Sequence, residues 1–69
     1  MLTKKKLENF LWNAVQLQDC NEKVLKGWFV KNEHNEYVLL PFDDIWHTYI
    51  LKASHIKWIM FLTNGYLQS

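Results

Sequence analysis

The sequence predicts a mostly β fold of the α+β class, with an N-terminal helix followed by about five short antiparallel strands in a small bent sheet or barrel. Three observations lead to this prediction. One stretch near the N-terminus has apolar residues at helical spacing, and the remainder consists of short runs rich in β-branched and aromatic residues. Polar clusters of turn-forming residues separate those runs. With 69 residues the chain has room for one domain, which we place over residues 1–69.

The helix is predicted over residues 4–13, with Thr3 as its N-cap. Its apolar residues recur at i, i+3, i+4 and i+7, which places them on one face. They are Leu7, Phe10, Leu11 and Ala14. Over residues 14–19 apolar residues alternate with glutamine, which favours a first strand there. A single helix that continues to Asp19 fits the same residues, so the state of residues 14–19 stays open at this point.

Four more strands are predicted in the rest of the chain. They cover residues 24–31, 37–40, 45–52 and 56–62. Gly27 interrupts the first of them, and a glycine inside a strand often marks a bend or a bulge. Pro41 ends the second because proline cannot donate to a ladder, and Asp43 with Asp44 turns the chain. The Asn-Gly pair at residues 64–65 suits a tight turn.

Aromatic residues are the most informative part of the composition. The chain has four Trp, four Phe and three Tyr, and all of its eight Lys and Arg positions are lysine. A domain of this size buries only about 60% of the surface that its unfolded chain exposes. We therefore expect more ring surface than the interior can hold, with some rings facing a partner. Abundant Lys, Asn and Ile without Arg is typical of AT-rich coding and indicates a low-GC bacterium, phage or plasmid.

The candidate interaction residues are Trp28, Trp46, Trp58 and Tyr49. Trp28 and Phe29 are neighbours in a predicted strand, so their side chains point to opposite faces and one faces outward if the strand is half-buried. Exposed Trp and Tyr side chains are favoured interface anchors. We expect the core to contain Phe10, Phe29, Tyr37 and Phe61.

Charge and motifs argue against several classes of protein. The net charge of +1 lacks the basic excess of a dedicated nucleic-acid binder. Ser54 and His55 have no third group to orient them as a catalytic pair, so we expect neither enzyme activity nor a cofactor. No Cys or His spacing matches a metal site, and the lone Cys20 cannot form an internal disulfide. Without a secretory signal or an apolar run of about 18 residues, we expect a cytoplasmic protein outside the membrane.

Three segments resemble the Sm-like family of small β-barrels, especially its bacterial Hfq branch. Residues 4–12 lie where the family has its helix, and residues 24–27 resemble its second strand with a glycine bend. Residues 50–56 resemble the family's stretch of aromatic, Lys, His and Ala between the last two strands. The resemblance implies a five-stranded bent barrel, a ring oligomer and RNA contacts from Lys52 and His55. The family's Lys and His are adjacent, whereas two residues separate them here.

Two functions from different classes fit the sequence. The first is a non-catalytic module that docks on a protein partner, as an inhibitor or adaptor of the phage or mobile-element type, or that self-assembles through its aromatic residues. The second is an Sm-like oligomer that binds single-stranded RNA or a nucleotide, with Tyr49 or Trp46 stacking on bases. Its candidate contacts are Lys26, Lys52, His55 and Lys57.

Overall fold

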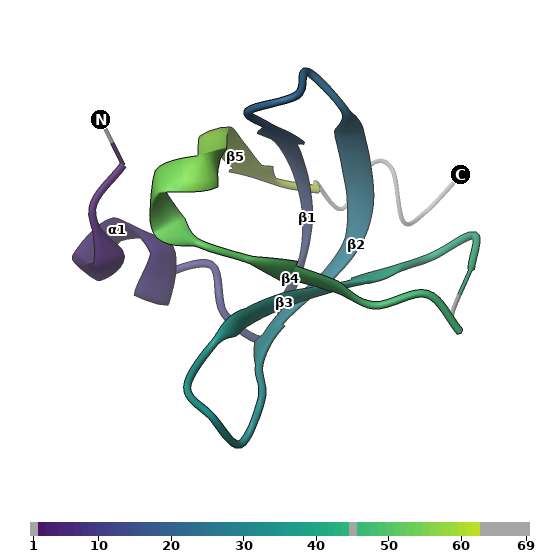
Figure 1. The fold of residues 1–69 in the computed structure, drawn as a ribbon, viewed down its shortest axis with the longest axis horizontal. Helices are drawn as coiled ribbons and strands as arrows, with labels where there is room; N and C mark the ends of the chain where they lie inside the picture. Colours follow the sequence, from purple (N-terminus) through teal and green to yellow (C-terminus); the bar gives the residue numbers. More distant parts are fainter. Residues whose placement is uncertain (1, 45, 63–69) are drawn as a thin grey trace.

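The computed structural model describes residues 2–44 and 46–62, which form one antiparallel sheet with a short N-terminal helix (Figure 1). The elements are α1 (Lys4–Glu8), β1 (Asn13–Asp19), β2 (Val24–Lys31), β3 (Tyr37–Pro41), β4 (Tyr49–Leu51), the 3-10 helix η1 (Ala53–His55) and β5 (Ile56–Phe61). The strand order is β4-β3-β2-β1-β5, and neighbouring strands are antiparallel. The prediction of a mostly β fold with an N-terminal helix is thus confirmed. The sheet is open, because β4 and β5 are its two edges.

Helix α1 begins as predicted and ends five residues early. Thr3 is the N-cap, and its side chain accepts a hydrogen bond from the backbone of the first turn. After Glu8, the N–H groups of residues 9–11 bond to carbonyls three residues back, which tightens the chain into 3-10-type turns. Trp12 then adopts a φ of 69°, in the left-handed region, and this directs the chain into β1. The open question over residues 14–19 is therefore resolved as strand.

A polar cluster attaches α1 to the hairpin of β2 and β3. The hydroxyl of Tyr37 donates a hydrogen bond to Glu8 Oε2 at 2.7 Å, and Lys31 Nζ lies 3.0 Å from the same oxygen. The hydrogen bonds from Tyr37 and Lys31 lower the pKa of Glu8. Burial and the bond to Glu8 raise the pKa of Tyr37 to about 12. The cluster therefore favours an ionised Glu8 beside a neutral Tyr37.

Both hairpins of the sheet use the same turn chemistry. Asp19 Oδ1 accepts the N–H groups of the residues two and four positions ahead, each at 2.9 Å. Asn32 Oδ1 does the same at 2.9 and 3.0 Å. Glu22 and Asn35 have positive φ in these turns. Short polar side chains thus satisfy the turn backbone, as the turn-forming residues in the sequence predict.

Gly27 lies where β2 and β3 approach most closely. It is opposite Pro41, and a Cβ at this position would lie 2.1 Å from the carbonyl oxygen of Leu40. Ordinary contacts of a Cβ begin near 3.4 Å, so only glycine fits between these backbones. The pairing registers with β1 and β3 run through Gly27 without a shift, so the bulge suggested by the sequence is absent there, and the close approach of the β3 backbone is the reason for glycine.

The fourth strand is much shorter than predicted. Only Tyr49–Leu51 pairs with β3. The preceding loop is held by Asp44, whose Oδ1 accepts the N–H of Trp46 at 3.3 Å and whose carbonyl accepts the N–H of His47 at 3.1 Å. These local bonds replace ladder bonds, so the described loop residues do not extend the strand. The Asn-Gly turn predicted at residues 64–65 lies outside the described residues.

Strand β5 carries a bulge that changes which side chains face the core. Gln18 lies opposite Trp58, whereas Asp19 lies opposite Ile56, so Lys57 is an extra residue on β5. Because of this shift, Ile56 and Ile59 both turn toward the core while Trp58 stays exposed. The regular alternation assumed from the sequence therefore fails across the bulge.

The core fills the inner side of the bent sheet and is closed at one end by α1. Its buried residues are Leu7, Leu11, Val15, Leu17, Leu25, Phe29, Tyr37, Leu39, Leu51 and Ile56. Phe29 and Tyr37 stack with ring centroids 5.4 Å apart, and Phe10 packs against the core as predicted. Phe61 was predicted to be buried, but it is 48% exposed. It lies near the end of β5, where it stacks on Phe10 at 4.4 Å.

Candidate interaction surfaces

All four indoles are exposed to solvent. The exposed fractions are 66% for Trp12, 47% for Trp28, 90% for Trp46 and 36% for Trp58. The sequence predicted surplus ring surface, and the fold leaves it on the outside. These four side chains therefore mark the surfaces where a partner would gain most from contact.

Two of the candidate residues, Trp28 and Trp58, lie on the outer side of the sheet. On β2 the inward residues are buried and the alternate residues, Trp28 among them, are exposed. β1 lies between β2 and β5 and contributes two glutamines to this side. Gln18 lies between Val24 on β2 and Trp58 on β5. Gln16 lies in the same way between Lys26 and Met60. The register thus brings together apolar side chains from strands far apart in the sequence.

We call this surface the apolar face, and it consists of Val24, Trp28, Phe42, Trp58 and Met60. Phe42 joins it from the turn after β3, because its ring meets Trp28 edge-on with centroids 5.6 Å apart. Trp58 is held by a hydrogen bond of 2.8 Å from its indole Nε1 to Gln18 Oε1. These five exposed apolar residues lie around Gln16 and Gln18 on one side of the sheet, and exposed apolar surface among polar side chains is typical of interaction sites.

Trp46 and Tyr49 do not belong to this face. Trp46 projects from the loop before β4. Tyr49 is half-buried, and its hydroxyl accepts a hydrogen bond from Lys23 Nζ at 2.9 Å. The Lys23 ammonium also lies 4.8 Å from the centre of the Tyr49 ring, and the ring centroids of His47 and Tyr49 are 4.4 Å apart. The bond to Tyr49 raises the pKa of Lys23, so this lysine stays charged.

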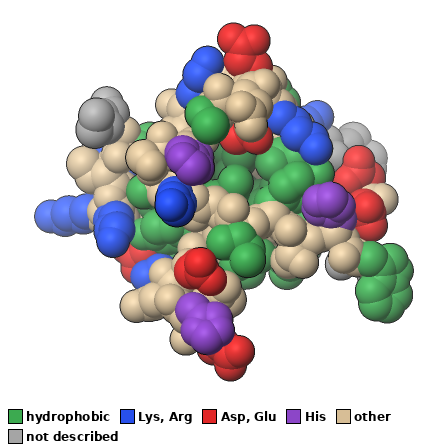
Figure 2. Space-filling model, in the orientation of Figure 1, with side chains coloured by type: hydrophobic (Ala, Val, Ile, Leu, Met, Phe, Trp, Pro, Cys, Tyr) green, Lys and Arg blue, Asp and Glu red, His purple; other side chains and the backbone are tan. Residues whose placement is uncertain are grey.

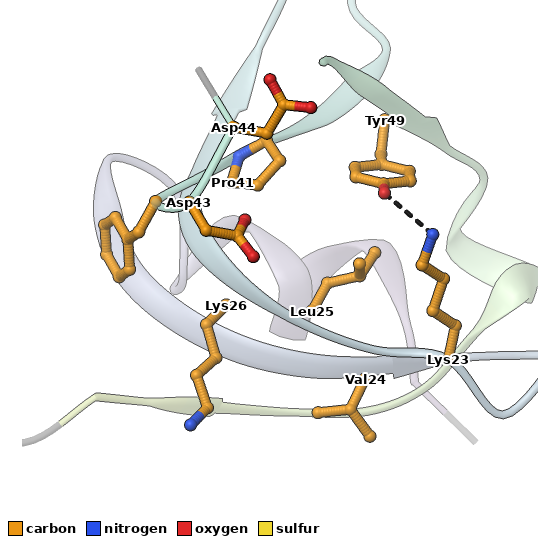
Figure 3. A pocket seen from close by; sticks show the side chains of 9 residues that line it. Lys23, Val24, Leu25, Lys26, Pro41, Asp43, Asp44 and Tyr49 are labelled. Atoms are coloured by element: carbon orange, nitrogen blue, oxygen red, sulfur yellow. Dashed lines mark hydrogen bonds between the residues drawn. The ribbon is translucent and has the colours of Figure 1, made fainter. Parts of the chain in front are cut away.

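Tyr49 lines a hollow beside the start of β2, which we call the β2 hollow (Figure 3). Its volume is about 470 Å³. The lining comprises Lys23, Val24, Leu25, Lys26, Pro41, Phe42, Asp43, Asp44 and Tyr49. On the side of the molecule shown in Figure 2, hydrophobic side chains gather in a hollow that has lysine, acidic and histidine side chains around it. The β2 hollow therefore combines an apolar floor with charges of both signs.

A second hollow, which we call the β4 hollow, lies beside the end of the edge strand β4. It has a volume of about 340 Å³ and brings Lys4, Lys52 and His55 together around the exposed Ile50. Lys57 lies elsewhere, on the β5 bulge, with its Nζ 3.7 Å from Glu22 Oε1. The four predicted nucleic-acid contacts are thus divided: Lys52 and His55 share the β4 hollow, Lys26 lines the β2 hollow, and Lys57 is near neither.

Sequence reasoning missed several residues of these surfaces. Phe42, Met60 and Ile50 are exposed apolar residues that were not selected as candidates. Met60 lies two residues after Trp58, so strand alternation places the two on one face and could have identified Met60. Phe42 and Lys23 depend on contacts between distant segments, with Trp28 and Tyr49 respectively. No local signal in the sequence predicts those contacts.

Comparisons with protein-family models, curated proteins and solved structures find no match to this chain. Among the described residues, no helix is long and apolar enough to cross a membrane. The same residues contain no group of three or more His, Cys, Asp or Glu side chains placed to hold a metal ion. The exposed surfaces described above are therefore the features of this chain that bear on its function.

Proposed function

We propose that this chain is a non-catalytic binding module that docks on another protein through the apolar face. The observation that carries the proposal is that the sheet register places Trp28 and Trp58, two strands apart, on one exposed surface. Tryptophans in an apolar surface with a polar rim are the residues that contribute most to protein interfaces. Such a module acts by occupying a surface of its partner, as an inhibitor or an adaptor.

The chemistry of the face indicates the kind of partner. Lys26 is the charged side chain between Val24 and Trp28 on β2, and it lies level with Met60 on β5. A partner protein with an apolar patch of its own, surrounded by polar side chains, fits this face. The lone, exposed Cys20 fits a reducing compartment, and we place the protein in the cytoplasm.

Affinity capture with matched variants tests this proposal. The immobilised protein is exposed to a low-GC bacterial lysate, and captured proteins are quantified for wild type, for the double variant Trp28→Ala, Trp58→Ala and for Ile50→Ala. Ile50 is an equally apolar, exposed strand residue at the β4 hollow, so it controls for nonspecific stickiness. We expect the recovery of one captured protein to fall at least tenfold with the double variant, and to stay at the wild-type level with Ile50→Ala. Equal recovery by all three proteins contradicts the proposal.

A second candidate function is the binding of single-stranded RNA or a nucleotide, as the Sm-like resemblance implies. The observation that favours it is that Lys4, Lys52 and His55 come together at the β4 hollow. Lysine meets phosphate as a point charge, and a homo-oligomeric ring would multiply these charges. Backbone groups on the free sides of edge strands β4 and β5 offer a route to such an assembly.

Titration of a fluorescent oligonucleotide, together with the solution mass, tests this second function. Binding through the β4 hollow should weaken steeply between low and moderate salt. It should also weaken in Lys52→Ala and remain unchanged in Lys57→Ala, which alters a lysine outside the hollow. A discrete hexamer or heptamer supports the ring. Absence of binding at micromolar protein by a monomeric chain would remove this candidate.

A further inference from the structure

The β2 hollow contains a gap in the sheet. β3 pairs with β2 only from Gly27, opposite Pro41, to Lys31, opposite Tyr37. The first three residues of β2, 24–26, pair with β1 on one side. No strand among the described residues pairs with them on the other side. The gap opens there because the chain turns away after Pro41.

The backbone of Val24 faces this gap. In an antiparallel strand the N–H and C=O of one residue point to the same side, and alternate residues share a side. The carbonyl of Lys26 points toward β3, since it accepts the N–H of Phe42 at 3.1 Å. Val24, two residues earlier, therefore directs its N–H and C=O to the same side, where the described part of β3 has ended. An edge of this kind is a template for one more strand.

The side chains around the gap suit an extended peptide (Figure 3). Leu25 and Pro41 are buried and provide an apolar floor. Positive charge comes from the start of β2 and the residue just before it, and negative charge comes from the turn after β3. The charged lining residues are Lys23, Lys26, Asp43 and Asp44. The volume of about 470 Å³ is within the usual range for a binding pocket.

We propose that the β2 hollow binds an extended segment of a partner protein, which adds a short strand beside Val24 and Leu25 in the place that β3 vacates. Three residues of such a strand span about 10 Å. Main-chain hydrogen bonds to Val24 supply affinity, and alternate side chains supply specificity. The matching segment places an apolar side chain over Leu25, an acidic one toward the lysines and a basic one toward Asp43 and Asp44. Val24 and Phe42 belong to both the β2 hollow and the apolar face, whereas Trp28 and Trp58 lie outside the hollow, so variants of the two tryptophans separate the two proposals.

Selection from a random heptapeptide phage library tests the proposal. The library is selected on wild-type protein, and the enriched peptides are synthesised and measured against Val24→Pro and Val24→Ala. Proline removes an N–H that points into the gap and leaves the β1 ladder intact, whereas alanine keeps that N–H. We expect binding to Val24→Ala within threefold of wild type and a loss of at least tenfold for Val24→Pro. The enriched peptides should alternate charged and apolar residues.

A backbone change in the peptide provides an independent measurement if Val24→Pro does not fold. Methylation of the peptide nitrogen that pairs with Val24 should reduce binding at least tenfold, and methylation of the next nitrogen should change it less than threefold. Failure to enrich any peptide, or equal binding by all methylated peptides, would overturn the proposal. The double variant Trp28→Ala, Trp58→Ala should bind the peptides normally, which separates this result from the test of the apolar face.

Discussion

The replacement Gly27→Ala tests how tightly β2 and β3 are joined. An alanine Cβ would lie 2.1 Å from the carbonyl oxygen of Leu40 and 2.8 Å from Pro41 Cα, and both are backbone atoms that cannot rotate away. To reach ordinary contact distance, the strands must separate locally by about 1 Å. Overpacking of this kind costs about 1–3 kcal/mol, and strained ladder hydrogen bonds add to that. We expect a loss of about 3 kcal/mol in the free energy of unfolding.

Urea denaturation followed by circular dichroism measures this loss. A domain of this size has a total stability of about 3–10 kcal/mol, so Gly27→Ala removes a large share of it and lowers Tm by about 15–20 °C. The control is Lys26→Ala, which places alanine at the neighbouring exposed position and should cost less than about 1 kcal/mol. If Gly27→Ala cost no more than this control, the close approach of β2 and β3 at Gly27 would be wrong.

Three further predictions concern the helix junction and the polar cluster. Glu8, whose pKa is lowered in the fold, should contribute fully to the free energy of unfolding above its unfolded pKa of 4.5, and this contribution should disappear as pH falls. Denaturation between pH 5 and 3 should therefore show a weaker pH dependence for Glu8→Gln than for wild type. The pKa of Tyr37, raised to about 12, predicts that the contribution of Tyr37 to the free energy of unfolding is complete below pH 10 and is lost as pH rises to 12. Tyr37→Phe should remove this dependence of stability on pH. Trp12→Gly relieves a left-handed φ of 69° and should stabilise the fold by about 0.5–1 kcal/mol in urea melts, whereas a loss above 1 kcal/mol would mean that the indole packs into the fold.

The sequence predicted the central strands well, because their signals are local. β2 runs over the residues predicted for it, whereas the reason for Gly27, the close approach of β3, depends on strand pairing that the sequence did not show. The end of α1 was not predictable in the same way. The apolar stripe from Leu7 to Ala14 is compatible with a helix and also with a helix that turns into a strand. The left-handed Trp12 decides between them, and it depends on a backbone hydrogen bond to Phe29 in β2.

The candidate surfaces were likewise predictable from the sequence only in part. Alternation predicted that either Trp28 or Phe29 faces outward, and the same rule places Met60 on one face with Trp58. It could not place Trp28 and Trp58 on one surface, because the order β5-β1-β2 is set by pairings between residues distant in the sequence. The gap beside Val24 was equally inaccessible, since it exists only because β3 ends at Pro41 while β2 continues. Nonlocal pairing therefore determines most of the candidate interaction surface.

The most direct test of the central claim is the recovery of a captured partner by Trp28→Ala, Trp58→Ala relative to wild type and Ile50→Ala, at equal amounts of folded protein. A selective loss of at least tenfold in the double variant is the result that we predict. Undiminished recovery with both indoles removed would show that the ring surface on this side of the sheet is not where binding occurs.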